Sequence, residues 1–338
     1  MKMNFFKWLL ISGGLMVFLL VSALISLLSG ELDISLKEAL LILFDMSGDN
    51  GSVEYMLIRQ VRMPRIMMGI AVGGSLSLAG LILQGVYRNP LVEPFTLGIS
   101  GGASLGVALT IVFGLHHFAG EFILPLSGFL GALLVVFIVY TFGTGRGKTD
   151  VTRMLLTGVM VSFVASSAML LLLSLSTTND IHGIIFWTMG SLDEPNNSLI
   201  MLNMGIALFG LVASYWFVRP LNALRLGEEK ALHLGINTSR SVKALFLLAS
   251  LMAGVSVAIA GVIGFVGLIV PHLLRMIFGS DYRILLVSSF LVGGSFLVLS
   301  DILARTILSP NELPIGVITG IIGGTIFILM MNRKKQAL

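Results

Sequence analysis

Few residues in this sequence could do chemistry, and the most suggestive group lies in a short glycine-rich stretch. Residues 143–149 read GTGRGKT, which looks like a loop that cradles a nucleotide phosphate. That chemistry needs the pattern G-x-x-x-x-G-K-[ST] between a strand and a helix. The position five residues before Gly147 is Phe142, so the first glycine is missing. We therefore expect a basic loop here and no ATP site on this chain.

The sequence also contains few residues that could bind a metal ion or relay ions across a membrane. The chain has no cysteine, and its adjacent His116 and His117 cannot share one helix face. Asp301 and Arg305 stand four apart in the favourable acid-first order, either as a local ion pair at a helix end or with Arg305 facing a partner. We expect no catalytic residue, no metal ligands and no cofactor bound by this chain.

The composition indicates a membrane protein. Of the 338 residues, 56% are hydrophobic and 11% are charged, and the mean hydropathy is +0.99. Soluble domains carry about 25% charged residues. Charge-free runs longer than about 18 residues predict an all-α chain that crosses the membrane repeatedly. Nucleic-acid binding would favour a basic stretch interleaved with aromatic residues, and the sequence contains none.

The apolar runs predict ten membrane-spanning helices in a single domain, 1–338. The first run follows Lys7 and is too long for a signal peptide, so we expect an uncleaved span. The run from Ala244 to Leu274 is too long for one span, and the glycines near Ala260–Gly264 suggest a break. The predicted spans lie at about 8–30, 66–87, 95–115, 122–142, 154–175, 198–218, 244–260, 262–278, 284–300 and 313–332.

The sidedness of charge favours the ten-span topology with both termini in the cytoplasm. Lys and Arg concentrate in cytoplasmic loops of membrane proteins. If the run from Ala244 to Leu274 forms two spans, all but five of the 21 Lys and Arg lie on the cytoplasmic side. If it forms one span, fewer of them lie on that side. The five external exceptions are Lys37, Arg59, Arg62, Arg65 and Arg305.

Two further patterns concern packing. The stretch QGVYRNPLVEPFTLGISGG, which begins at Gln84, contains a stiff, charged segment that we call the elbow, Arg88–Gly102. Its prolines restrict the backbone, so we expect it to move as a unit. Small residues recur every four positions on two predicted spans and suggest close helix packing or a subunit seam. They are Gly69, Gly73 and Ser77 on one span and Gly316, Gly320 and Gly324 on the other.

The elbow and several other stretches resemble the iron-siderophore and vitamin B12 permeases (FecCD type) of ATP-binding-cassette importers. The resemblance spans nearly the whole chain and keeps the family's order, and the family has ten spans. Its last span typically has a proline where Thr325 stands, and Val92 replaces a smaller residue in the elbow. The matching stretches are RMPR at 62–65, WTMGS at 187–191, RLGEEKALHLGI at 225–236, GFVGLIVPHLLR at 264–275, SDILAR at 300–305 and ELPIGVITGIIGGTIF at 312–327.

The resemblance implies partners and site residues. It implies a permease homodimer in a bacterial or archaeal cytoplasmic membrane, two separate ATPase subunits that hold ATP and Mg²⁺, and an external substrate-binding protein. Docking of that protein is implied for Arg62, Arg65 and Arg305, which could instead anchor a helix end at lipid headgroups. A cytoplasmic gate is implied at Asn89 and Leu91 and at Asp150 and Val151. ATPase coupling is implied for Leu226, Gly227, Glu228, Glu229, Ala231, Leu234 and Gly235, although a helix lying on the membrane surface is the alternative there.

The expected function is import of a metal chelate, with a ferric siderophore as first choice and vitamin B12 or haem as alternatives. An ion-coupled secondary transporter is the competing hypothesis, but the predicted spans lack the buried acids and lysines of ion relays. An intramembrane enzyme is a third hypothesis. The spans contain serines and threonines but no paired histidine and carboxylate set.

Overall fold

The computed structural model describes residues 5–30, 32, 34–45, 51–117, 120, 122–145 and 148–335. Arg146 and Gly147 of the glycine-rich loop therefore lie outside the described residues. The described residues are built into helices, as the sequence predicts, apart from one hairpin of two two-residue strands. The helices are α1 (Phe5–Leu28), α2 (Leu36–Leu43), α3 (Val53–Met56), α4 (Met63–Tyr87), α5 (Ile99–Val112), α6 (Ile123–Gly143), α7 (Val151–Leu175), α8 (Thr178–Met189), α9 (Asn197–Tyr215), α10 (Val218–Leu224), α11 (Glu228–His233), α12 (Thr238–Ala260), α13 (Val266–Phe278), α14 (Tyr282–Thr306) and α15 (Ile315–Lys335).

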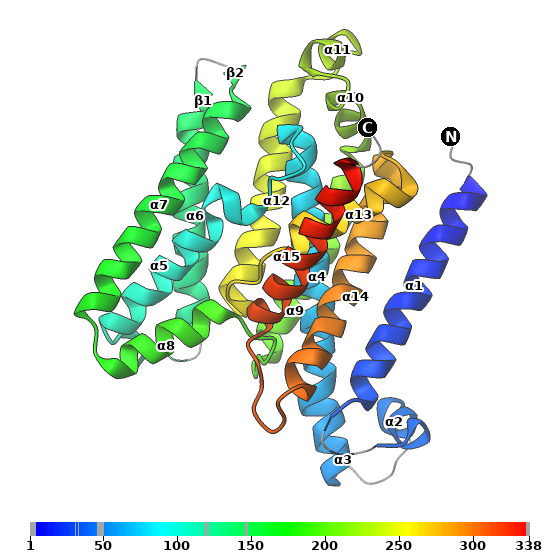
Figure 1. Cartoon of the computed structure of the whole chain (residues 1–338), viewed down its shortest axis with the longest axis vertical. Helices are drawn as coiled ribbons and strands as arrows, with labels where there is room; N and C mark the ends of the chain where they lie inside the picture. The colour runs from blue at the N-terminus through cyan, green and yellow to red at the C-terminus, as the bar shows by residue number, and fades with distance from the viewer. Residues whose placement is uncertain are drawn as a thin grey trace.

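Shorter elements join these helices. A π-helical segment at Leu57–Arg62 (η1) fuses α3 to α4, and 3-10 turns occupy Pro94–Leu97 (η2) and Leu115–His117 (η3). The strands β1 (Thr144–Gly145) and β2 (Lys148–Thr149) pair antiparallel between α6 and α7. The hairpin, α10 and α11 lie at one end of the long helices, and α2 and α3 lie at the other (Figure 1). We call these the α11 end and the α3 end.

Several helices have the length and composition of membrane spans. Within the described residues, seven helices are long and apolar enough to cross a membrane, and α5, α13 and α15 are shorter apolar helices. The total of ten crossings therefore stays a prediction. α12 ends at Ala260 and α13 begins at Val266, so helical geometry is interrupted where the glycines near Ala260–Gly264 suggest a break.

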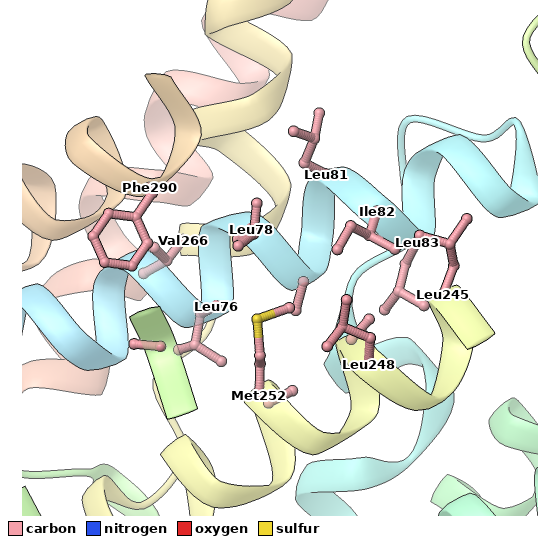
Figure 2. Packing of buried hydrophobic residues seen from close by; sticks show 14 of the residues in the cluster. Leu76, Leu78, Leu81, Ile82, Leu83, Leu245, Leu248, Met252, Val266 and Phe290 are labelled. Carbon is pink, nitrogen blue, oxygen red and sulfur yellow. The ribbon is translucent and has the colours of Figure 1, made fainter. Parts of the chain in front are cut away.

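α4 is the centre of the bundle. It packs against α14, α12, α9 and α13, and 89% of its most apolar stretch is buried inside the chain. Its side chains interdigitate with those of α12 and α14 (Figure 2). Leu76 and Leu83 on α4 are among the most buried residues, as is Met252 on α12. A helix apolar on every face fits this position because it has protein on all sides.

The small residues of α4 let backbones touch. A Cβ on Gly73 would lie 2.3 Å from the carbonyl oxygen of Gly293 on α14, and a Cβ on Gly80 would lie 2.0 Å from that of Gly267. The Gly69–Ser77 ridge therefore packs within the chain, against α14. The ridge on α15 is different, because Gly316 meets Met189 whereas nothing lies within 4 Å of a Cβ on Gly320.

This contrast gives a matched pair of variants. Gly73→Ala forces α4 and α14 apart, and overpacking of this kind costs about 1–3 kcal/mol. We expect a fall of several degrees in the apparent unfolding temperature, measured by scanning fluorimetry in detergent. Gly320→Ala serves as the control because it should leave that temperature unchanged or slightly higher, since Ala is the better helix former. Equal behaviour of the two variants would contradict the proposed α4–α14 contact.

Candidate gate, coupling face and outer arginine cluster

The elbow begins where α4 unwinds. Arg88 caps α4 in the left-handed conformation, with φ of 49°, and the chain then turns through Asn89 and Pro90. The Asn89 side-chain oxygen accepts the Leu91 N–H at 2.9 Å, which closes a local turn. Leu91 itself is 51% exposed. The sequence-predicted gate residues Asn89 and Leu91 thus lie at the tip of a short, internally bonded turn.

The second half of the elbow is fixed against α13. Phe265, just before α13, has φ of 69°, which is unusual for a bulky residue, and its N–H donates to the Glu93 carboxyl group. On α4, Gln84 donates to the carbonyl oxygens of Gly267 at 3.1 Å and Leu268 at 3.3 Å. These contacts tie the elbow, α4 and the start of α13 into one unit.

Glu93 is an unusual member of this unit. Its Oε2 atom is buried and has no hydrogen-bond partner. Burial raises the pKa of Glu93 to about 7, and the Phe265 N–H, which favours the ionised form, only partly opposes it. A carboxyl group with this pKa changes charge near neutral pH. The sequence alone gave no reason to single it out.

The second gate stretch lies at the start of α7. The Asp150 carboxylate accepts the Arg153 N–H at 3.0 Å and so caps α7. Val151 is half-buried and packs against the main core. Thr149, in β2, bonds to Ser239 at the start of α12. Among the described residues, no hydrogen bond or ion pair links this stretch to Asn89 or Leu91 within one chain.

The predicted coupling segment forms a short exposed helix. Gly227, with φ of 106°, precedes α11, and Gly235, with φ of 78°, follows it, so both ends need glycine geometry. Leu226 is 57% exposed and Leu234 62% exposed. Ala231, also implied as a coupling residue, is fully buried and faces the rest of the chain. In a helix this short, the sequence did not reveal which side faces the protein.

Other residues of the segment 226–235 are also exposed at the α11 end. Leu232, which the sequence analysis did not select, is 54% exposed. Glu229 is exposed, and Glu228 accepts a hydrogen bond from Thr238 at 3.3 Å. Three exposed leucines beside two acids therefore lie at the α11 end. Arg88 of the elbow reaches toward this helix, since its Nη1 lies 3.9 Å from where a Cβ on Gly227 would be.

The three predicted docking arginines gather at the α3 end, but their side chains are largely buried. Arg62 donates to the carbonyl oxygens of Leu27 at 2.6 Å and Leu32 at 2.9 Å. Arg305 pairs with Asp301 at 2.9 Å and donates to the Ser26 and Ser29 carbonyl oxygens. Both arginines thus satisfy carbonyls at the carboxyl end of α1, where a cation also complements the helix dipole.

Arg65 is bound differently. It makes a two-pronged ion pair with Glu312, with an Nη1–Oε1 distance of 2.9 Å, and its Nε lies 3.7 Å from Asp193. The Arg65 side chain is only 5% exposed, whereas those of Asp193 and Glu312 are 69% and 52% exposed. The groups that reach the surface here are therefore acids. Because Glu312 binds both terminal nitrogens of Arg65, a partner's carboxylate would have to displace it to take over these two hydrogen bonds.

Comparison with known proteins gives a consistent picture. The family model described as "FecCD transport family" matches residues 18–333. The chain is similar to three permeases, matched over at least 94% of this chain and 92% of each relative. They are the uncharacterized ABC transporter permease protein YvrB of Bacillus subtilis (36% identical over 326 residues, 94% of this chain and 92% of the relative), the hemin transport system permease protein HmuU of Yersinia pestis (34% over 329 residues, 97% and 96%) and the vitamin B12 import system permease protein BtuC of Klebsiella pneumoniae (37% over 332 residues, 97% and 94%).

A solved structure is also similar to this one. It is described as an inward-facing conformation of a metal-chelate type ABC transporter, and it superposes with a TM-score of 0.84 at 31% sequence identity. The match covers 96% of this chain and 99% of that chain. The resemblance drawn from the sequence motifs is therefore confirmed across nearly the full length.

The buried Glu93 carboxyl group predicts a pH-dependent stability. A raised pKa in the folded state means that the neutral form stabilises the fold, so this contribution is complete below the ordinary value of 4.5 and is lost as the pH rises through about 7. We expect the apparent unfolding temperature of the wild type to fall across this interval.

The Glu93→Gln variant should remove that part of the pH dependence, because its amide does not ionise. Glu229→Gln is the control, since Glu229 is an exposed acid at the same end of the molecule and its replacement should leave the wild-type profile unchanged. Parallel profiles for the wild type and Glu93→Gln would refute the assignment.

Proposed function

Because the chain belongs to the FecCD transport family, we propose that it is the membrane permease subunit of an ATP-binding-cassette importer for a metal chelate. The proposal rests on the proximity of two features at the α11 end. The stiff elbow with its exposed Leu91 lies beside an exposed leucine-bearing helix, α11. A movable gate and a docking helix for a separate ATPase would need to be adjacent in this way.

The proposal includes an orientation and an assembly. We place the α11 end in the cytoplasm, since this assignment puts most Lys and Arg inside and leaves Lys37, Arg59, Arg62, Arg65 and Arg305 outside. The chain then crosses the membrane ten times, with both termini in the cytoplasm. It acts as a homodimer with two ATPase subunits, which hold ATP and Mg²⁺, and receives substrate from an external binding protein. The membrane is the cytoplasmic membrane of a bacterium or archaeon.

The substrate class that we propose is a metal chelate. A ferric siderophore is our first choice from the sequence, and relatives named for hemin and vitamin B12 transport support haem and vitamin B12 as alternatives. Among the described residues, no group of three or more His, Cys, Asp or Glu side chains could hold a metal ion. We therefore treat the metal as part of the cargo and assign selection among chelates to the binding protein.

The exposed leucines on and beside α11 offer a way for ATP hydrolysis on a separate subunit to act on this chain. Leu226, Leu232 and Leu234 present apolar side chains that a groove on a partner can bury. The buried Ala231 packs the same helix against the rest of the permease. A displacement of α11 by the ATPase would therefore also displace the residues that Ala231 contacts. Arg88 lies beside Gly227 and belongs to the elbow, which gives this motion a short path to Leu91.

Replacing both Leu226 and Leu234 with Asp should detach the ATPase, because two charges would then enter an apolar contact. The assay is co-purification of the ATPase, followed by chelate uptake into proteoliposomes supplied with binding protein and ATP. We expect both signals to fall at least tenfold. Leu308→Asp is the control for co-purification, since Leu308 has the same 57% exposure as Leu226 but lies in the α14–α15 loop at the α3 end.

Two outcomes would count against this assignment. Wild-type co-purification of the double variant would remove α11 from the interface. Uptake by the permease alone, driven by a proton or sodium gradient without ATP, would favour the secondary-transporter alternative.

Docking of the binding protein at the α3 end is proposed to work by exchange of partners. Glu312 is 52% exposed and holds both terminal nitrogens of Arg65, so it can be reached from outside. An incoming carboxylate can replace Glu312 and take over both hydrogen bonds from Arg65. Arg62 and Arg305 then act as framework, because their donors hold the end of α1.

Arg65→Gln should weaken binding-protein affinity about tenfold, the loss of a charge-assisted pair. Glu312→Gln should have the opposite effect, since Arg65 would then lack its internal competitor. Lys37→Gln, an exposed external charge in α2, is the control. Biolayer interferometry at low salt measures all three, and unchanged affinity in both Arg65→Gln and Glu312→Gln would rule out the exchange.

A further inference from the structure

A polar cavity lies at the α11 end, beside the elbow, and the proposed transport function assigns it no ligand. It has a volume of about 420 Å³ and lies where the end of α4, the elbow, α13 and the start of α14 meet. Arg88, Arg225, Arg275 and His272 line it, and no carboxylate does. Its wall includes Met276, which is 54% exposed, so one side of its rim is apolar.

The arginines of this cavity are not neutralised by the protein. Among the described residues, none of the three forms an ion pair with an acid. Arg225 donates to the Ser280 carbonyl oxygen, and Arg275 bonds to the Tyr282 hydroxyl oxygen. The Nη2 atom of Arg275 is buried with no hydrogen-bond partner. A buried guanidinium donor without an acceptor is costly, so an anion in this cavity would stabilise it.

A second unsatisfied group points to the chemistry of that anion. Gln84 is 3% exposed and lines the same cavity. Its amide nitrogen is bound to the Gly267 and Leu268 carbonyl oxygens, which fixes the orientation of the amide, and its Oε1 is buried with no partner. Oε1 can only accept a hydrogen bond. The ligand should therefore combine negative charge with a hydroxyl donor.

The nearby acids do not supply this charge. Asp281 accepts hydrogen bonds from Asn222 and Arg283, and it pairs with Arg283 at 3.1 Å. Glu228 accepts from Thr238. Both carboxylates already have partners, and neither lines the cavity.

The position of the cavity suits lipid headgroups as well as water-borne anions. The Trp8 indole N–H and the Tyr215 hydroxyl both donate to the Arg283 carbonyl oxygen, at 3.1 and 2.7 Å. Trp and Tyr gather at the level of the headgroups in membrane proteins. Tyr282, which lines the cavity, is the neighbour of Arg283. Basic pockets between helices at this level bind anionic phospholipids.

We propose that the cavity of Arg88, Arg225 and Arg275 binds a phosphate group that carries or adjoins a hydroxyl donor. Two sources supply this chemistry, namely the headgroup of an anionic phospholipid such as phosphatidylglycerol and free inorganic phosphate. The arginines bind the phosphate oxygens, and Gln84 Oε1 accepts the hydroxyl hydrogen. The proposal requires binding alone and does not depend on the transport function.

Two measurements on the full-length chain separate the sources. The first is native mass spectrometry after release from nanodiscs of mixed phosphatidylglycerol and phosphatidylcholine. The second is ³¹P NMR line broadening of inorganic phosphate, with the protein in a maltoside detergent. We expect at least one signal in the wild type, and Arg275→Gln should weaken it about tenfold, as for the loss of a hydrogen bond to a charged group.

Arg88→Asn provides a second variant that should fold normally, because Arg88 is exposed and Asn tolerates its left-handed backbone. Arg240→Gln, an exposed arginine at the start of α12, is the control and should behave as the wild type. Variant-sensitive retention of phosphatidylglycerol assigns the lipid source, and variant-sensitive phosphate broadening alone assigns the free ion. Absence of both signals, or signals that neither variant weakens, overturns the proposal.

Discussion

Every helix that ends inside a membrane protein leaves backbone groups that water cannot reach, and this constraint shapes the whole chain. The partners here come from distant parts of the chain. Arg62 and Arg305 take the carbonyls at the end of α1. Within α13, Gln84 donates to the Gly267 carbonyl, which Pro271 leaves without a helical partner because proline has no N–H, and to the Leu268 carbonyl beside it. The Ser191 N–H donates to the Ala260 carbonyl oxygen, where α12 ends. Each break in a helix is thus also a junction between elements that are distant in sequence.

These junctions give the permease rigid parts and movable parts. α4 touches α14 and α13 through glycine backbones, so these three helices form a stiff centre. The elbow and α11 are attached to that centre by a few specific contacts, among them the Glu93–Phe265 hydrogen bond and the buried Ala231. A gate that opens needs this combination, because a well-packed core transmits force without deforming and only its attached loops change position.

Much of this architecture could be predicted from sequence because its signals are long. A charge-free run of twenty residues has few alternatives to a spanning helix, and the excess length of 244–274 exposes the break after Ala260. Short-range features were harder. The helix α8 lies between two predicted spans where the sequence predicted no helix, and no pattern showed that Ala231 is the buried member of the six-residue helix α11. The burial of Arg62 and Arg305 depends on where α1 ends in space, which no local pattern specifies.

The caps on α1 also bear on how the chain is assembled. Only 17% of the most apolar stretch of α1 is buried against the rest of the chain. Its final turn is nevertheless bound by Arg62 and Arg305. Arg305 lies 276 residues after the Ser29 carbonyl that it binds. Because synthesis runs from the N-terminus, α1 is made long before Arg305. The Ser26 and Ser29 carbonyls that Arg305 binds must therefore be met by other donors until α14 is present.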